Sequence, residues 1–178
     1  MSALDHIRKL HLPDGARILD VGGGSSVLVD ALLRENTSWS ITVLDISQSA
    51  LDHAQTRLGS LAKRVTWVAA DITQWIANDP VDLWHDRALL HFLADASDRA
   101  TYANTLRTAL KPGGIALIAS FSLNGPEKCS NLPVHRYDAQ GMLATLGSGI
   151  ILKDHWLMHH HTPSDKVQEF QFCLFQRV

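Results

Sequence analysis

The sequence predicts an α/β protein with a doubly wound, Rossmann-like sheet, and three observations lead to that prediction. Short apolar segments alternate with segments of helical period along most of the chain. A glycine cluster, Gly22 to Gly24, follows the first apolar segment directly and opens into a helix. The last two apolar segments are joined by a turn and predict an antiparallel hairpin. Residues 1–178 are expected to form one domain, because that length suits a single core.

The individual elements follow from local signals. Ser47 is expected to cap the N-terminus of one helix, and the run Lys111-Pro112-Gly113-Gly114 ends another because proline and glycine cannot continue it. Asp71 is a candidate cap for a short helix through Ile76. Residues 159–163, which include three adjacent histidines, are expected to form the turn of the final hairpin. The expected strands are residues 16–21, 39–44, 65–69, 81–84, 115–121, 150–158 and 167–175.

Composition excludes several classes of protein. The net charge is −2 and the basic residues are scattered, so there is no electrostatic footprint for nucleic acid. No apolar run reaches the length of a membrane span and no leader pattern is present, so we expect a cytoplasmic protein without a membrane partner. Cys129 and Cys173 show no metal or disulfide spacing. Adjacent strand residues face opposite ways, so the three histidines at 159–161 predict no metal site.

The glycine cluster predicts a site for a nucleotide-bearing small molecule, since a strand, a tight turn and a helix N-terminus form a polar cradle. A dinucleotide fingerprint would place glycine where Val27 stands, and a P-loop would need a lysine nearby, which is missing. Asp20, two residues before Gly22, would repel a pyrophosphate but suits a cationic amino acid. Asp45 ends the second strand, where a carboxylate can accept from both ribose hydroxyls.

The stretch Asp20-Val21-Gly22-Gly23-Gly24-Ser25-Ser26 resembles motif I of the class I S-adenosylmethionine-dependent methyltransferases, with Ser26 in place of the third glycine. The run Leu-Lys-Pro-Gly-Gly before the fifth strand is also typical of that class. The resemblance extends from Arg17 onward and implies strand order 3-2-1-4-5-7-6 with S-adenosyl-L-methionine as cofactor. It also implies that Asp71 binds the adenine amino group and that the backbone of Ile72 reaches a ring nitrogen. The cofactor-binding residues expected are Asp20, Gly22, Gly23, Gly24, Asp45, Ile46, Asp71, Ile72 and His85.

Polar residues at the end of the fourth strand are expected beside the reactive methyl, because that strand borders the ligand crevice. His85, Asp86 and Arg87 stand there, and we assign Asp86 and Arg87 as catalytic, with Asp86 as the acceptor of a proton. A structural ion pair between Asp86 and Arg87 is the alternative. His91 is a candidate for contact with the acceptor or for packing.

The segment 122–137 is expected to be a long loop that recognises the acceptor, with Arg136 for an anionic group and Tyr137 for a polar contact. The motif of amino-methylating DNA enzymes is absent after the fourth strand, where the chain has His85-Asp86-Arg87-Ala88. The predicted acceptor is therefore a small thiol, amine or carboxylate. The short N-terminal region would leave the acceptor site open or completed by another subunit, in a monomer or a homodimer.

Three alternatives remain at this point. A protein lysine could be the acceptor if the site is open to a chain. A non-catalytic module could bind S-adenosylmethionine without transferring its methyl group. An NAD-dependent oxidoreductase would share the fold and Asp45, although Val27 occupies the place of its sixth-position glycine and no substrate domain is visible.

Overall fold

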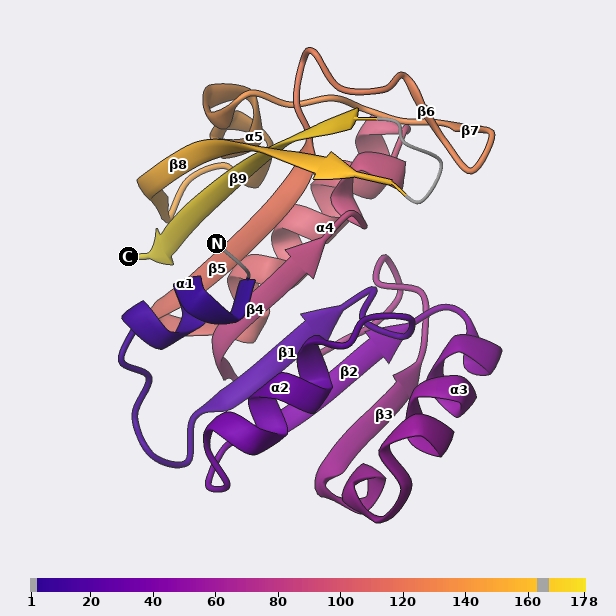
Figure 1. Ribbon diagram of the computed structural model, residues 1–178. Coiled ribbons are helices and arrows are strands. Elements are labelled where there is room, and N and C mark those ends of the chain that lie inside the picture. The colour runs from indigo at the N-terminus through magenta and orange to yellow at the C-terminus, as the bar shows by residue number, and fades with distance from the viewer. Residues whose placement is uncertain (1–2, 163–166) are drawn as a thin grey trace.

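The computed structural model describes residues 3–162 and 167–178, which form a mixed seven-stranded sheet with helices on both faces (Figure 1). The strand order is β3-β2-β1-β4-β5-β9-β8. This order confirms the predicted one, since β6 and β7 form a separate small ladder within the segment 122–137. The strands of the large sheet are β1 (Arg17–Val21), β2 (Ser40–Asp45), β3 (Val65–Ala69), β4 (Val81–Arg87), β5 (Leu110–Phe121), β8 (Ile150–His161) and β9 (Val167–Arg177).

Helices cover the two faces of the sheet and connect its parallel strands, except between β3 and β4. One face carries α1, α2 and α3, and the other carries α4 and α5 (Figure 1). Ser47 caps α3 as predicted, because its hydroxyl accepts from the amide of Ala50 at 3.2 Å. The helices are α1 (Ala3–Lys9), α2 (Leu28–Glu35), α3 (Gln48–Leu58), α4 (Ala96–Ala109) and α5 (Ala139–Leu146), with 3₁₀ turns η1 (Gly59–Arg64) and η2 (Leu90–Phe92).

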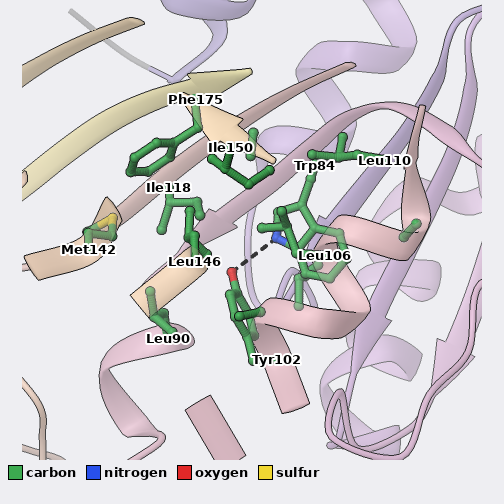
Figure 2. Close-up of a cluster of buried hydrophobic side chains, with 14 of the residues drawn as sticks. Trp84, Leu90, Tyr102, Leu106, Leu110, Ile118, Met142, Leu146, Ile150 and Phe175 are labelled. Atoms are coloured by element: carbon green, nitrogen blue, oxygen red, sulfur yellow. Dashed lines mark hydrogen bonds between the residues drawn. The ribbon is translucent and has the colours of Figure 1, made fainter. Parts of the chain in front are cut away.

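Two apolar cores lie on opposite sides of the sheet because alternate residues of a strand face opposite ways. On β4, Leu83 belongs to the core under α1 and α2, whereas Trp84 belongs to the core under α4 and α5. In the second core the indole of Trp84 donates to the hydroxyl of Tyr102 at 3.1 Å (Figure 2). This alternation also determines which polar residues of β4 face each side.

Three local expectations were wrong. No helix runs from Asp71 to Ile76; the carboxylate of Asp71 instead accepts from the amide and hydroxyl of Thr73 and stabilises a turn. α4 does end just before the run Lys111-Pro112-Gly113-Gly114, but this run already belongs to β5, which was expected to begin at residue 115. Within the run, Lys111 forms an ion pair with Asp82 at 2.7 Å. The segment 122–137 is not a plain loop, since it contains β6 (Lys128–Cys129) and β7 (Leu132–Pro133).

The final hairpin is also longer than expected. β8 runs through His161, and His159, His160 and His161 pair with Glu169, Gln168 and Val167 of β9. The expected turn at these histidines is therefore wrong, and Pro163 lies outside the described residues. No group of three metal-ligating side chains occurs within residues 3–162 and 167–178. Over the same residues, no helix combines the length and apolarity needed to cross a bilayer.

Candidate active site

Two adjoining hollows lie at the C-terminal ends of the parallel strands. The first, here called the Asp45 hollow, has a volume of about 400 Å³, and the second, the Arg87 hollow, about 380 Å³. They adjoin at Gly22 and Ala88, which line both. The Asp45 hollow is lined by Gly22, Asp45, Ile46, Ala70, Asp71, Ile72, Thr73, Ala88, Leu89, Phe92, Leu93, Asp98 and Leu132. The Arg87 hollow is lined by Asp20, Val21, Gly22, Gly23, Ser25, Ser26, Val27, His85, Arg87, Ala88, His91, Phe121, Cys129, His160, Gln168 and Phe170.

The glycine loop between β1 and α2 separates the two hollows. Gly22 adopts φ +69°, a conformation in which a side chain is strained. A Cβ on Gly23 would lie 2.4 Å from Oδ2 of Asp20, and one on Gly24 would lie 2.8 Å from Oδ2 of Asp45. Side chains are therefore excluded where the loop folds over the two carboxylates.

Asp45 and Asp71 sit side by side on the wall of the Asp45 hollow. One oxygen of Asp45 accepts from the amide of Gly24 at 2.9 Å and the other from the amide of Ser47 at 2.9 Å. Each carboxylate oxygen can accept further hydrogen bonds, so Asp45 can still bind two adjacent hydroxyl groups. Ile46 is exposed above this wall and Ile72 is buried in it.

Asp20 and His85 form a buried pair on the floor of the Arg87 hollow. Their strands are neighbours in register, and Nδ1 of His85 donates to Oδ1 of Asp20 at 2.7 Å. Oδ2 of Asp20 and Nε2 of His85 are also buried, and neither has a partner among the described residues. A buried polar atom left unpaired costs about 1–3 kcal/mol, so this floor would be stabilised by a ligand with hydrogen-bonding groups.

Arg87 and His91 also line the Arg87 hollow. Arg87 ends β4 on the same face as His85, since the two are two residues apart on one strand. His91 is 0% exposed and its ring stacks on Phe121 with centroids 4.4 Å apart. Burial lowers the pKa of His91 to about 4, so the imidazole is neutral at pH 7.

The structure requires a correction for Asp86, which lines neither hollow. Its side chain faces α4, is 0% exposed and accepts from the hydroxyl of Tyr102 at 2.6 Å and from the amides of Leu89 and Leu90 at 2.8 and 3.1 Å. Burial raises the pKa of Asp86 to about 6. No ion pair joins it to Arg87 in the described part of the chain. The geometry supports a positioning role, because Asp86 fixes the turn that presses Leu89 against Gly22.

Arg136 and Tyr137 also lie outside both hollows, against their predicted contact with the acceptor. The guanidinium of Arg136 donates to the carbonyl of Gly125 and to Glu127, at 3.2 and 3.3 Å. Tyr137 is buried in the core under α4 and α5, and burial raises the pKa of its hydroxyl to about 12. Both side chains hold the segment 122–137 in place.

Sequence reasoning missed the wall that the C-terminal hairpin contributes. His160, Gln168 and Phe170 line the Arg87 hollow; His160 does so because β8 continues past its predicted end at residue 158, whereas Gln168 and Phe170 lie within the predicted strand 167–175. The sequence already contained a signal that Asp86 faces away from His85 and Arg87. The period of two on β4 puts His85 and Arg87 on one face and Asp86 on the other.

A parallel sheet with a glycine loop after β1, carboxylates after β2 and β3 and an antiparallel C-terminal hairpin defines a nucleotide-binding α/β fold of the methyltransferase type. The family described as "Methyltransferase domain" matches residues 19–116. The chain therefore belongs to this methyltransferase domain family, and the resemblance found in motif I is confirmed.

Individual relatives agree with this assignment. Trans-aconitate 2-methyltransferase of Pseudomonas paraeruginosa is 30% identical over 62% of this chain and 37% of its own length. The chain spans about two fifths of the length of the curated relatives it matches. An S-adenosylmethionine-dependent methyltransferase of Methanosarcina mazei has a similar fold, with TM-score 0.78 at 15% identity over 100% of this chain and 98% of that one. The N-methyltransferase NodS of Bradyrhizobium japonicum, in complex with S-adenosyl-L-homocysteine, gives 0.72 at 18% identity over 98% and 86%.

Proposed function

We propose that this chain is an S-adenosylmethionine-dependent methyltransferase that acts on a small molecule. The observation that supports this most directly is that the Asp45 hollow and the Arg87 hollow adjoin at Gly22 and Ala88, which line both. Such an arrangement can hold an adenosyl group on one side and an acceptor on the other, with the transferred group at the junction. The relatives above are named for trans-aconitate methylation and for N-methylation, which supports a small acceptor.

The residues of the two hollows fit the proposed cofactor. Asp45 would bind the ribose hydroxyls, Asp71 the adenine amino group and the backbone of Ile72 a ring nitrogen. The unpartnered Oδ2 of Asp20 would accept from the ammonium of the methionine part, beneath the space that Gly23 leaves free.

S-adenosylmethionine supplies a methyl group that is already activated on a sulfonium. The tasks left to the protein are to align the acceptor with that methyl group and to exclude water. Ala88 lines both hollows, and Leu89 lines the Asp45 hollow next to it. The buried pair of His85 and Asp20 forms the floor of the Arg87 hollow. Phe121 and Phe170 contribute an apolar wall.

We further propose a cytoplasmic protein that acts as a monomer or a homodimer without nucleic acid. The free thiols of Cys129 and Cys173 support a reducing compartment. A net charge of −2 supports a small-molecule acceptor over nucleic acid. Light scattering would give the oligomeric state. A filter-binding assay with DNA and RNA would test the proposal that the protein acts without nucleic acid.

The function is tested by titration calorimetry with S-adenosylhomocysteine and S-adenosylmethionine, with NAD as the competing ligand. At a concentration 100 times the dissociation constant, a bound cofactor stabilises the protein by about 2.7 kcal/mol. For a chain of this size the melting temperature then rises by about 5–10 °C. Asp45→Asn should weaken binding, whereas Asp52→Asn, at an exposed site on α3, should not.

A labelled-methyl screen over thiols, amines, carboxylates and a lysine peptide would then identify the reaction. Transfer to a small molecule supports the proposal. Transfer only to the peptide supports a protein acceptor, and cofactor binding without any transfer supports a non-catalytic module. Binding of NAD in place of S-adenosylhomocysteine would overturn the proposal.

A further inference from the structure

A polar cluster lies behind the wall that the C-terminal hairpin contributes to the Arg87 hollow. Gln168 and Phe170 line that hollow, and Glu169 between them faces the opposite side of β9. In the same way His160 lines the hollow, whereas His159, which pairs in register with Glu169, faces the opposite side of β8. Nε2 of His159 lies 3.1 Å from Oε2 of Glu169. This contact joins the two strands on the face that points away from the hollow.

Glu169 also binds the first residues of the segment 122–137. The hydroxyl of Ser122, which is 3% exposed, donates to Oε1 of Glu169 at 2.6 Å, and the side-chain amide of Asn124 donates to the same oxygen at 3.4 Å. The backbone amide of Ser122 donates to the carbonyl of Glu169 at 3.1 Å, which extends the pairing of β5 with β9. The hydrogen bond from Ser122 lowers the pKa of Glu169, so its carboxylate is ionised at pH 7. The bond from the Ser122 hydroxyl is therefore charge-assisted, which is the stronger kind.

The turn that begins the segment 122–137 closes directly on Glu169. The amide of Gly125 donates to the carbonyl of Ser122 at 2.9 Å, and the hydroxyl of Ser122 accepts from the amide of Asn124 at 3.2 Å. A Cβ on Gly125 would lie 2.8 Å from the carbonyl oxygen of Glu169. The side chain and the backbone of Glu169 therefore both fix the place where the segment leaves β5.

The same segment contributes to the walls of both hollows. Cys129 of β6 lines the Arg87 hollow, and Leu132 of β7 lines the Asp45 hollow. Cys129 and Leu132 are paired in register, so a displacement of one strand displaces the other. A shift of the turn after β5 would therefore change the walls of both hollows together.

We propose that Glu169 is a positioning residue of the active site, which holds the segment 122–137 from behind the hairpin wall and so places Cys129 and Leu132 beside the cofactor. This inference rests on the proposed methyltransferase function. Glu169 lines neither hollow. Its effect on the cofactor is therefore exerted through Ser122 and the turn that follows.

Alkylation of Cys129 by iodoacetamide tests the position of the segment in the full chain. Cys129 is partly exposed and Cys173 is buried, and peptide mapping by mass spectrometry assigns the label to each thiol. S-adenosylhomocysteine should slow the alkylation of Cys129 in wild type, because the ligand would occupy the hollow that this thiol lines. The ratio of the rates without and with S-adenosylhomocysteine measures this protection. A contact that only stabilised the fold would lower the midpoint of urea unfolding without changing the ratio.

Glu169→Leu removes the acceptor and keeps a side chain of similar size. Alkylation of Cys129 in the free protein should accelerate at least about tenfold, because a charge-assisted hydrogen bond that holds the segment is lost. Protection by S-adenosylhomocysteine should fall, and calorimetry should show its affinity weakened at least about threefold. Glu169→Gln keeps an oxygen that can accept from Ser122, so rates and affinity should stay within about twofold of wild type. The matched control Glu35→Leu loses an ion pair with Arg8 at 2.7 Å, lines neither hollow, and should leave rates and affinity unchanged.

Two outcomes would overturn the proposal in a chain that binds S-adenosylhomocysteine. One is a Glu169→Leu variant with the alkylation rate and affinity of wild type. The other is a loss in Glu169→Gln equal to that in Glu169→Leu, since the bond from Ser122 would then not be what places the segment.

A second variant decides the case in which Glu169→Leu also makes Cys173 reactive, which would indicate a loosened core. Ser122→Ala removes the same bond from the side of the segment and should accelerate the alkylation of Cys129 alone. A wild-type rate in Ser122→Ala would overturn the proposal. A wild-type chain that binds no S-adenosylhomocysteine would remove the proposed function and the role in an active site with it. The alkylation of Cys129 in the free protein would still show whether Glu169 holds the segment, so the two failures are distinguishable.

Discussion

Gly23 occupies a position where no side chain fits. A Cβ there would lie 2.4 Å from Oδ2 of Asp20 and 3.1 Å from Cγ1 of Val43, so the loop or the carboxylate would have to move. The same oxygen of Asp20 is the one left without a hydrogen-bond partner. The absence of a side chain at Gly23 therefore lets the loop pack directly over that oxygen.

Gly23→Ala should reduce affinity for S-adenosylhomocysteine and lower stability by about 1–3 kcal/mol through overpacking. Gly15→Ala is the matched control. Gly15 has φ +70° and no atom near its Cβ position, so the substitution costs backbone strain of about 1–2 kcal/mol without touching the site. Calorimetry measures the affinity of both variants and urea unfolding measures their stability. An equal loss of affinity in Gly23→Ala and Gly15→Ala would contradict a specific role of Gly23 in the site.

The buried His91 makes stability depend on pH. Its pKa is about 4 when folded and about 6.5 when unfolded, so the unfolded chain binds more protons between those values. The contribution of the neutral His91 to the free energy of unfolding is therefore fully present above pH 6.5 and is lost as the pH falls toward 4. His91→Phe keeps an aromatic ring beside Phe121 and should gain about 2 kcal/mol relative to wild type on going from pH 7.5 to pH 5. Urea unfolding at the two pH values is the measurement, and a difference independent of pH would show that folding does not lower the pKa of His91.

At the scale of elements, a hydrogen-bonded network connects α4 to the end of β4. The Tyr102 hydroxyl accepts from the indole of Trp84 (Figure 2). It donates in turn to Asp86, and all three side chains are buried. Asp86 in turn caps the turn that contains Leu89 and Leu90. The position of that turn beside Gly22 therefore depends on Tyr102 of α4, a residue that lines neither hollow.

Tyr102→Phe should destabilise the protein by about 1–3 kcal/mol at pH 8, because the Trp84 donor and the Asp86 carboxylate each lose a partner. The loss should be smaller at pH 5. Burial already raises the pKa of Asp86 to about 6, and removing the Tyr102 hydroxyl raises it further, so at pH 5 the folded carboxyl is protonated in both proteins. Tyr137→Phe is the control, since Tyr137 is also buried and its hydroxyl has no partner of good geometry among the described residues. A cost that is the same at both pH values would contradict the proposed network.

At the scale of the whole molecule, Trp156 connects the N-terminal helix to the C-terminal hairpin. The ring of His6 on α1 stacks on Trp156 with centroids 4.0 Å apart, and Trp156 stacks on Phe172 of β9 at 5.4 Å. These contacts hold α1 against the sheet edge formed by β8 and β9 (Figure 1). Trp156 lines neither the Asp45 hollow nor the Arg87 hollow.

Trp156→Ala should cost about 2–3 kcal/mol of stability, because stacking and buried apolar area are both lost. Amide exchange in α1 should accelerate, while affinity for S-adenosylhomocysteine stays within about twofold. Leu157→Ala is the matched control on the same strand, since Leu157 is 53% exposed. Hydrogen-exchange mass spectrometry would reveal the difference, and unchanged exchange in α1 would show that other contacts hold the helix.

The sequence by itself determined the features that depend on neighbours along the chain. Glycines directly after an apolar segment require a turn at Gly22, and each strand of the parallel part has an apolar run of its own. The carboxylates of Asp45 and Asp71 then fall at one edge of the sheet, because parallel strands all end there. The glycine loop and these carboxylate positions were therefore predictable from the residues, whereas the strand order was predicted from the resemblance to the methyltransferases.

Only the tertiary structure decided which polar groups remain free for a ligand. Asp86 and Arg87 are adjacent in sequence, yet one is engaged by Tyr102 from α4 and the other stays unpaired in a hollow. The wall formed by His160 and Gln168 exists because β8 continues past its predicted end and pairs with the start of β9. The physical reason is that hydrogen-bond partners and strand pairing are supplied by residues distant in the chain, which a local pattern does not specify.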